Sequence, residues 1–405
     1  MSKKLAKDQS CIIIGASHAG VNCAFQLRRE GWEGKIQLFD ASEDFPYHRP
    51  PLSKSCLLED ELQLNFLKPK DSYEKNEIDL KLGKRVISID KEKKSLSCDQ
   101  GEEFFYDKLV LATGARAAIP PIPGLSEVKN LFVLRSAADV VQIRKGIQHI
   151  ASPKILIIGG GFIGLEVAAS LRKLGLEVEL LEREERILAR VSCPEISTFF
   201  QQYHESKGAK IFCGKELTHI EVQENRNLIS CADGSSFEAD LLVLGTGIMV
   251  NIELAKQAEI EVENGIKVNE YMETSVADIY AIGDNSYHFH PLYQRFTRIE
   301  SVPNAVAQAR IAASRISGKS MVYTEVPWFW SDQYGLKFQT AGLFNGYEEL
   351  IMRKEGEDKF SVWYFKGDQL VAVDAVNSPK AYMMGRRLIK EGNRIDKTKL
   401  VDTNL

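Results

Sequence analysis

The pattern of apolar and polar positions predicts the same short unit twice. An apolar run at Cys11–Ile14 is typical of a buried strand, and a glycine-bearing loop and a helical pattern lead from it to a second strand at Lys35–Phe39. The same order recurs with a strand at Lys154–Ile158, a loop, a helix at Leu165–Leu174 and a strand at Glu177–Leu181. Two such repeats predict an α/β fold.

Three more apolar runs, one between the two repeats and two after them, end in glycine turns. A helix follows the last run. The runs cover Leu109–Ala115, Leu241–Gly247 and Ile279–Asp284. Residues Val302–Ile316 have a helical pattern with a proline at the second position, where a helix tolerates it.

The remaining segments indicate how the chain is divided. The proline-rich stretch Ile119–Gly124 predicts a crossover between domains. From about Val322 the pattern changes to strand-like aromatic runs, which predict a separate small α+β domain. These runs are Trp328–Trp330, Lys337–Leu343, Lys359–Phe365 and Leu370–Val376.

The first repeat has the features of a dinucleotide-binding loop. Gly15 permits a tight turn after the strand, Gly20 permits close packing of helix and strand, and amides at the helix N-terminus can meet phosphates. Asp40 ends the second strand, where a carboxylate can accept both ribose hydroxyls. Ser17 stands where the strict motif has glycine, so this loop alone is weak evidence.

The second repeat carries the complete motif, Gly159-x-Gly161-x-x-Gly164, and Glu182 ends its second strand. A carboxylate there favours NADH over NADPH, because it would repel a 2′-phosphate. Arg183 and Arg186 follow directly and leave NADPH open. Two loops in one chain imply two dinucleotides, and a flavin with a nicotinamide is the chemically sensible pair.

Composition and cysteine spacing narrow the function classes. The net charge of −4 gives no reason to expect nucleic acid or an anionic membrane as partner, and the chain has no run of about 18 apolar residues that would span one. Seven cysteines show no C-x-x-C or zinc-type spacing, so we expect no metal site, cluster ligands or redox dithiol. Scattered thiols suit a reducing, cytoplasmic location.

Several longer motifs resemble those of one family, the FAD-dependent, NADH-linked ferredoxin and rubredoxin reductases of oxygenase systems. The resemblance covers nearly the whole chain and includes both loops. The other motifs are Tyr47–Lys54, Ala112–Gly114, Ala281–Asp284, Arg298–Asn304 and Pro327–Asp332. It implies a fold like that of glutathione reductase. The implied domains are an FAD domain at 1–117 and 249–321, an NAD domain at 118–248, and a C-terminal interface domain at 322–405.

The resemblance also implies roles for particular residues. The candidate catalytic residues are Lys54, Glu166 and Trp330. The candidate FAD residues are Gly15, Ser17, His18, Ala19, Gly20, Asp40, Arg49, Lys54, Val86, Ala112, Thr113, Gly114, Arg135, Gly283, Asp284, Ser301, Val302 and Trp330. The candidate NAD residues are Gly159, Gly161, Phe162, Ile163, Gly164, Glu166, Glu182, Gly245, Thr246 and Gly247.

Alone, some of these residues have simpler interpretations. Arg49 and Lys54 would suit solvated charges beside a proline turn, and Trp328 and Trp330 have the spacing of a strand core. Their occurrence together in the expected order favours the functional interpretation. The turn Gly247–Asn251 departs from the family pattern at Met249 and Val250.

Cysteine placement also bears on the electron acceptor. The segment Asp44–Lys54 contains no cysteine, and Cys56 follows it, so we expect no thiol to receive electrons. This favours a one-electron carrier: a small [2Fe–2S] ferredoxin, or less readily a rubredoxin, feeding a Rieske oxygenase or a cytochrome P450. Two alternatives stay open, an apoptosis-inducing-factor-like protein and an NADH oxidase. Charge alone suggests five residues for carrier docking: Arg295, Arg298, Lys337, Arg386 and Arg387.

Overall fold

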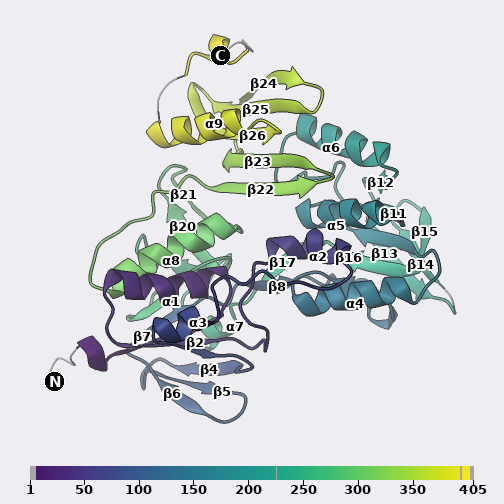
Figure 1. Ribbon diagram of the computed structural model, residues 1–405. Coiled ribbons are helices and arrows are strands. Elements are labelled where there is room, and N and C mark those ends of the chain that lie inside the picture. The colour runs from purple at the N-terminus through teal and green to yellow at the C-terminus, as the bar shows by residue number, and fades with distance from the viewer. Residues whose placement is uncertain (1–5, 225, 393–394, 402–405) are drawn as a thin grey trace. The chain divides into compact units, whose positions relative to one another are not determined.

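The structure, a computed structural model, describes residues 6–224, 226–392 and 395–401 (Figure 1). The chain forms two compact units. The first contains Met1–His48, Asn65–Ala115 and Val250–Phe329, and the second contains Arg49–Leu64, Arg116–Met249 and Trp330–Leu405.

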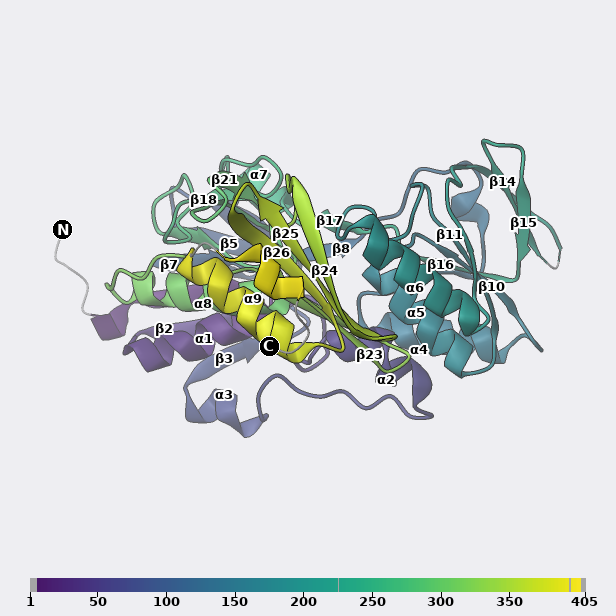
Figure 2. The ribbon, with the colours of Figure 1, turned by 90° about the horizontal axis from the view of Figure 1, so that it is seen from above.

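The first unit is built on a parallel sheet of five strands in the order β19-β7-β1-β2-β3. The strands are β1 (Ser10–Ile14), β2 (Lys35–Phe39), β3 (Ile78–Lys81), β7 (Lys108–Leu111) and β19 (Ile279–Ala281). Helix α1 (His18–Glu30) packs on β1 and β2, and α8 (Val302–Ile316) lies beside α1 (Figures 1 and 2). This order brings the loops after β1, β7 and β19 to one edge of the sheet.

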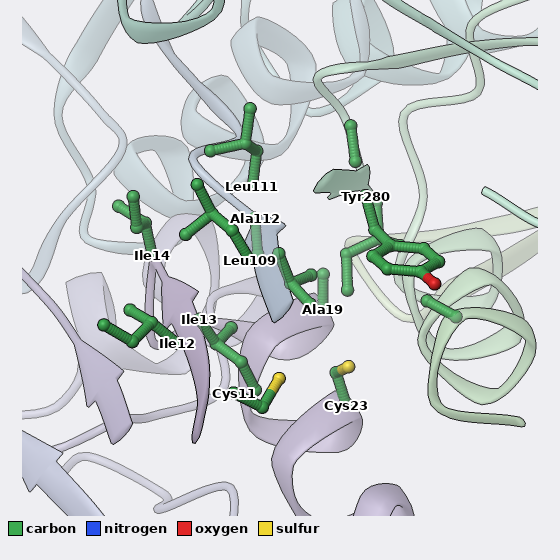
Figure 3. Close-up of a cluster of buried hydrophobic side chains, with 14 of the residues drawn as sticks. Cys11, Ile12, Ile13, Ile14, Ala19, Cys23, Leu109, Leu111, Ala112 and Tyr280 are labelled. Atoms are coloured by element: carbon green, nitrogen blue, oxygen red, sulfur yellow. The ribbon is translucent and has the colours of Figure 1, made fainter. Parts of the chain in front are cut away.

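Figure 3 shows the core of this unit, where β1 meets α1 and β7. Ile12 and Ile13 are fully buried, and burying each side chain stabilises the fold by about 1.5–3 kcal/mol. Cys11 and Cys23 belong to the same cluster and behave as small apolar residues. Burial raises the pKa of the Cys11 thiol to about 12.

The second unit contains another parallel sheet of five strands, in the order β12-β11-β10-β16-β9. Its strands are β9 (Leu131–Val133), β10 (Lys154–Ile158), β11 (Glu177–Leu181), β12 (Lys210–Phe212) and β16 (Leu241–Leu244). Helix α5 (Phe162–Lys173) packs on β10 and β11, and α4 (Ala137–Gln148) packs on β9. A capping box between Ser136 and Asp139 closes the start of α4.

The C-terminal part carries a five-stranded sheet in the order β22-β23-β26-β25-β24. Its elements are β22 (Trp328–Gln333), β23 (Leu336–Gly342), β24 (Glu349–Gly356), β25 (Lys359–Lys366), β26 (Gln369–Val376) and the covering helix α9 (Pro379–Glu391). Helix α9 starts at a proline and ends at Glu391, and Gly392 follows in the left-handed conformation, so the helix has ordinary start and stop signals.

Smaller elements complete the two units. In the first they are η1 (Ala6–Asp8), α3 (Asp71–Lys75), β4 (Val86–Asp90), β5 (Ser95–Cys98), β6 (Glu103–Phe105), α7 (Glu253–Gln257), β18 (Ile266–Val268), β20 (Ser286–His290) and β21 (Arg295–Thr297). In the second they are η2 (Pro50–Ser53), α2 (Ser55–Leu58), η3 (Leu125–Glu127), α6 (Pro194–Ser206), β13 (Leu217–Val222), β14 (Asn227–Cys231), β15 (Ser236–Ala239) and α10 (Lys397–Val401). Strands β8 (Ala115–Ala117) and β17 (Ile248–Val250) lie where the chain passes between the units.

The predicted α/β class with two repeats is confirmed, and the four repeat strands lie within one residue of their expected bounds. The helix of the second repeat begins three residues earlier than expected, at Phe162, directly after the loop. The prediction missed β24, whose Glu, Arg and Lys residues hide its strand character. The division into three domains stays a prediction. None of the helices among the described residues is long and apolar enough to cross a membrane.

Candidate functional site

The loop after β1 is shaped by contacts that exclude side chains. Gly15 has a φ of +106°, and a Cβ there would lie 2.2 Å from the Ala112 carbonyl oxygen. A Cβ on Gly20 would lie 1.9 Å from the Gly15 oxygen. The glycines permit the tight turn and the close approach of α1 that the sequence predicted, and they also bring the loop against the turn after β7.

Asp40 bonds back to this loop from the end of β2. The Ala16 amide donates to Asp40 Oδ2 over 2.6 Å, and the Ser42 amide donates to Oδ1 over 2.9 Å. These bonds fix the carboxylate beside the loop. Each carboxylate oxygen has two lone-pair sites, so both retain an acceptor site for ribose hydroxyls.

The second unit repeats this arrangement. The Gly160 amide donates to Glu182 Oε2 over 2.6 Å, and the Glu184 amide donates to Oε1 over 2.9 Å. A Cβ on Gly159 would lie 2.5 Å from the Gly245 oxygen, and a Cβ on Gly164 would lie 2.1 Å from the Gly159 oxygen. Loop and acid therefore have the same geometry in both units.

Gly161 is the exception among these loop glycines. A Cβ at this position would meet no protein atom within 4 Å, and its φ of −78° suits any residue. Packing and backbone strain therefore do not require glycine here. Open space beside the first amides of α5 is what a diphosphate needs. In the first loop Ser17 holds the equivalent position, at the N-cap of α1.

The predicted turn residues Thr113 and Thr246 connect their turns to distant segments of the chain. Thr113 Oγ1 donates to the Asn251 carbonyl oxygen over 2.8 Å, and Asn251 Nδ2 donates to the Thr113 oxygen over 2.9 Å. Asn285 Nδ2 donates to Thr113 Oγ1 over 2.9 Å. Thr246 Oγ1 donates to the Ala118 carbonyl oxygen over 2.7 Å. Both threonine hydroxyls therefore donate to protein oxygens. Asn251 and Asn285 are additional site residues that were not predicted from the sequence.

The turn after β19 is held by α8. Gln308 Oε1 accepts the Gly283 amide over 2.7 Å and the Ser286 hydroxyl over 2.8 Å. Ser301 caps α8 by accepting the Asn304 amide, so Val302 is the first residue of the helix. The Gly283–Asp284 turn and the middle of α8 are therefore joined through one buried amide side chain.

A buried ion pair lies in the second unit. Lys54 Nζ lies 2.6 Å from Glu166 Oε2, and the two side chains are 21% and 3% exposed. Ser53 Oγ donates to the same oxygen, and Ser331 Oγ donates to Oε1 over 2.6 Å. The candidate catalytic residues Lys54 and Glu166 therefore form an ion pair. Ser53 and Ser331 were not named as site residues, although they lie within the motifs Tyr47–Lys54 and Pro327–Asp332.

The other candidate FAD residues lie in both units. Arg49 Nη1 donates to the Arg135 carbonyl oxygen over 2.7 Å, so these two meet. His18 is buried against His48, and Val86 is buried in the core. The predicted FAD residues are divided between the units, since Arg49, Lys54, Arg135 and Trp330 belong to the second.

Arg298, expected at a docking surface, is instead largely enclosed. Its side chain is 14% exposed, and Nη1 lies 2.6 Å from Glu300 Oε1 and 3.5 Å from the Asp284 carbonyl oxygen. The paired guanidinium supports the turn after β19. A docking role for Arg298 is therefore not supported, whereas Arg295, Lys337 and Arg387 are exposed.

Comparisons with known proteins agree with this geometry. The model of the family described as pyridine nucleotide-disulphide oxidoreductase matches residues 9–309, and the reductase C-terminal family model matches residues 328–405. Putidaredoxin reductase of Pseudomonas putida is 37% identical over 405 residues, with 98% of this chain and 96% of the relative covered. Rubredoxin-NAD(+) reductase of the same species is 36% identical over 373 residues, with 91% and 96% covered.

Solved structures give the same result. The chain is similar to the reductase in the covalent putidaredoxin reductase–putidaredoxin complex, with a TM-score of 0.92, 37% identity, and 98% and 96% of the two chains covered. It is also similar to the ferredoxin reductase for the CYP199A2 system of Rhodopseudomonas palustris, with a TM-score of 0.93, 34% identity and 98% of both chains covered.

Proposed function

The chain belongs to the pyridine nucleotide-disulphide oxidoreductase family, and from this premise we propose that it is an NADH-dependent flavoprotein that reduces a small iron–sulfur protein. The observation that carries the proposal is a repeated cradle, by which we mean a glycine loop together with the acid that bonds to it. Each unit holds a glycine loop whose amide is bonded to an acid one strand away, Asp40 in one and Glu182 in the other. Two cradles match two dinucleotides, FAD and NADH.

The residues present fit both groups. In the first cradle, Gly15 and Gly20 have no side chain to obstruct the place where the loop, the helix and the turn meet. Asp40 retains acceptor sites for ribose hydroxyls. In the second, Gly161 leaves space beside the α5 N-terminus. A bound flavin supplies the step from two-electron hydride chemistry to one-electron transfer, which amino-acid side chains cannot provide.

We assign the site roles that the family resemblance implies, with Asn251, Asn285 and Gln308 added as supports of the flavin turns. In this assignment Lys54 and Glu166 serve the flavin and nicotinamide, and Trp330 serves electron exit. The α8 N-terminus, beginning at Val302, presents the positive end of its dipole to the flavin. Residues 1–117 with 249–321, 118–248 and 322–405 remain the proposed FAD, NAD and interface domains.

The loop after β11 favours NADH as the donor. Glu182 occupies the position that a 2′-phosphate would approach. Arg186 is fully engaged in its own loop, where its guanidinium donates to the Ser192 and Ala189 oxygens and to Ser197 Oγ. Arg183 pairs with Glu184 at the surface. The cations that would recognise NADPH are therefore already paired.

The thiols argue for an external one-electron acceptor. All seven cysteines are free, and burial raises the pKa of each, so no thiol is activated as a nucleophile. Cys56, nearest in sequence to Lys54, is 2% exposed. This disfavours an NADH oxidase or peroxidase that uses a cysteine. Relatives named as putidaredoxin, terpredoxin and rubredoxin reductases favour an electron carrier over an apoptosis-inducing-factor-like role.

We therefore propose a [2Fe–2S] ferredoxin, or alternatively a rubredoxin, as partner, with a Rieske oxygenase or cytochrome P450 downstream. Arg295, Lys337 and Arg387 are the exposed cations proposed for docking, with Arg386 beside them. Free thiols suit a reducing compartment, and we propose a cytoplasmic location.

NADH-dependent cytochrome c reduction, assayed with and without added ferredoxin, tests this function. We expect strong dependence on ferredoxin. Equal rates in its absence, or NADH consumption with oxygen as the main acceptor, would contradict it.

A further inference from the structure

A line of buried polar side chains leads from α6 to the Lys54–Glu166 pair within the second unit. His204 Nε2 lies 2.8 Å from Gln333 Oε1, Gln333 Nε2 donates to Ser331 Oγ over 3.1 Å, and Ser331 Oγ donates to Glu166 Oε1 over 2.6 Å. The four side chains are at most 3% exposed. Their hydrogen-bonding groups are therefore satisfied chiefly by one another.

The chemistry of the groups fixes the direction of every bond. The Glu166 carboxylate, paired with Lys54, only accepts, so the Ser331 hydroxyl has to donate to it. Ser331 Oγ then accepts from the Gln333 amino group, which turns Gln333 Oε1 toward His204. An amide oxygen only accepts, so His204 Nε2 has to carry the proton.

The histidine end of the line is consistent with this direction. Burial lowers the pKa of His204 to about 4, although the bond to Gln333 opposes the shift, so the ring is neutral near pH 7. A neutral ring with a proton on Nε2 has none on Nδ1, and Nδ1 is the ring nitrogen that lacks a hydrogen-bond partner. The ring packs edge-on against Tyr334 at 4.9 Å.

The line joins elements that are far apart in sequence. His204 is near the end of α6, Ser331 and Gln333 share the inner side of β22, and Glu166 lies on α5. Exposed Asp332 lies between the two inner residues, as strand alternation requires. Apolar side chains would suit this buried side equally well for packing alone, and only polar ones can orient a carboxylate.

We propose that His204 and Gln333 are positioning residues, which act through Ser331 to fix the Glu166 carboxylate and thereby the Lys54 ammonium. The Ser331 bond occupies Oε1, which leaves Oε2 for Ser53 and Lys54. With Oε1 held, the carboxylate keeps one rotamer, and Lys54 Nζ keeps its place between Glu166 and the Pro50 carbonyl oxygen, 3.2 Å away. The inference rests on the proposed function only in taking this ammonium to serve hydride transfer.

The tautomer of His204 can be read without any assay of activity. Nitrogen-15 NMR of the holoenzyme at pH 7 distinguishes protonated from bare ring nitrogens, and the His204→Gln variant identifies the signal. We expect a single species with the proton on Nε2, and a mixture of tautomers in Gln333→Leu. A proton on Nδ1, or a mixture in the unaltered protein, would overturn the proposal even if the protein reduces ferredoxin as proposed.

A matched pair of variants tests the effect on the reaction. His204→Gln places an amide N–H where Nε2–H lies, whereas His204→Leu has similar bulk and no donor. In anaerobic stopped-flow reduction by saturating NADH, we expect His204→Leu to slow flavin reduction on the order of tenfold and His204→Gln to retain most of the rate. Equal rates in both variants, with flavin content and melting temperature matched, would mean that His204 contributes only packing, and this would overturn the proposal. If His204→Leu does not fold, His204→Phe replaces it in the comparison with His204→Gln, because phenylalanine keeps a ring and has no donor for Gln333. Retention of the rate by neither or by both would contradict the proposal.

Discussion

Lys54 Nζ lies 2.6 Å from Glu166 Oε2, with the carboxylate 3% exposed and the ammonium 21% exposed. Removing one member of such a pair leaves the other charge buried without its counterion. Lys54→Met should therefore lower the free energy of unfolding by about 2–4 kcal/mol, somewhat less than for a fully buried pair. Denaturant unfolding of the flavin-loaded protein measures this.

The double variant Lys54→Met/Glu166→Gln is the control. It removes both charges, so it should be more stable than Lys54→Met alone. If the double variant loses the sum of the two single effects, the pair has no coupling and the account of this ion pair is wrong.

Substitution by alanine should have different effects on stability and NADH binding at Gly161 and at Gly164. Gly161→Ala meets no protein atom within 4 Å, so its free energy of unfolding should change by less than about 1 kcal/mol. Its KM for NADH should rise about tenfold, because the methyl group takes the space proposed for the diphosphate.

Gly164→Ala is the matched comparison. Its Cβ would lie 2.1 Å from the Gly159 oxygen, so it should destabilise the protein by about 1–3 kcal/mol. Thermal melting and NADH kinetics of both variants separate the effects. An unchanged KM in Gly161→Ala would show that the dinucleotide does not approach this loop.

Glu182 should set the preference between the nicotinamide donors. Glu182→Ala should improve the kcat/KM ratio of NADPH to NADH about tenfold, because a like charge beside the 2′-phosphate is removed. Glu177→Gln, at the exposed start of the same strand, should leave the ratio unchanged. Arg186→Met should lower the melting temperature rather than alter this ratio, since Arg186 bonds within its own loop.

Three buried histidines should make stability depend on pH. Burial lowers the pKa of His204 and His290 to about 4 and that of His288 to about 3, whereas an unfolded histidine titrates near 6.5. Above about pH 6.5 both states are neutral. As pH falls from there toward 4, only the unfolded chain gains protons, so stability is lost by up to about 1.4 kcal/mol per pH unit for each histidine.

The variant His290→Phe should make the dependence of stability on pH shallower by about the contribution of one histidine. His219 is exposed, so His219→Gln should leave the slope unchanged. Urea unfolding between pH 7 and 5 measures both. Identical slopes for His290→Phe and the unaltered protein would mean that His290 is protonated in the folded state.

The sequence predicted the two cradles because their signals are local. Gly15 and Asp40, like Gly159 and Glu182, are separated by one strand and one helix, so the repeat is visible without tertiary information. The Lys54–Glu166 pair came only from resemblance, since these residues are far apart in the chain.

The supports of the site escaped prediction for a physical reason. Ser331, Gln333 and His204 have other polar residues beside them in sequence, so no local pattern distinguishes them. Their contacts with Glu166 and with one another join β22 to two separate helices. The charge of Arg298 suggested a surface role, whereas its side chain is 14% exposed and contacts Glu300 and the Asp284 carbonyl oxygen. Burial of a polar group is a tertiary property that sequence periodicity does not encode.

The central claim is that the chain accepts two electrons from NADH and passes them singly to an iron–sulfur protein. Anaerobic titration of the purified protein, followed by its visible absorbance, tests this most directly. We expect about one equivalent of NADH to bleach the flavin and about two equivalents of oxidised [2Fe–2S] ferredoxin to restore the colour. A protein that carries no flavin, or a reduced flavin that ferredoxin cannot reoxidise, would contradict the account.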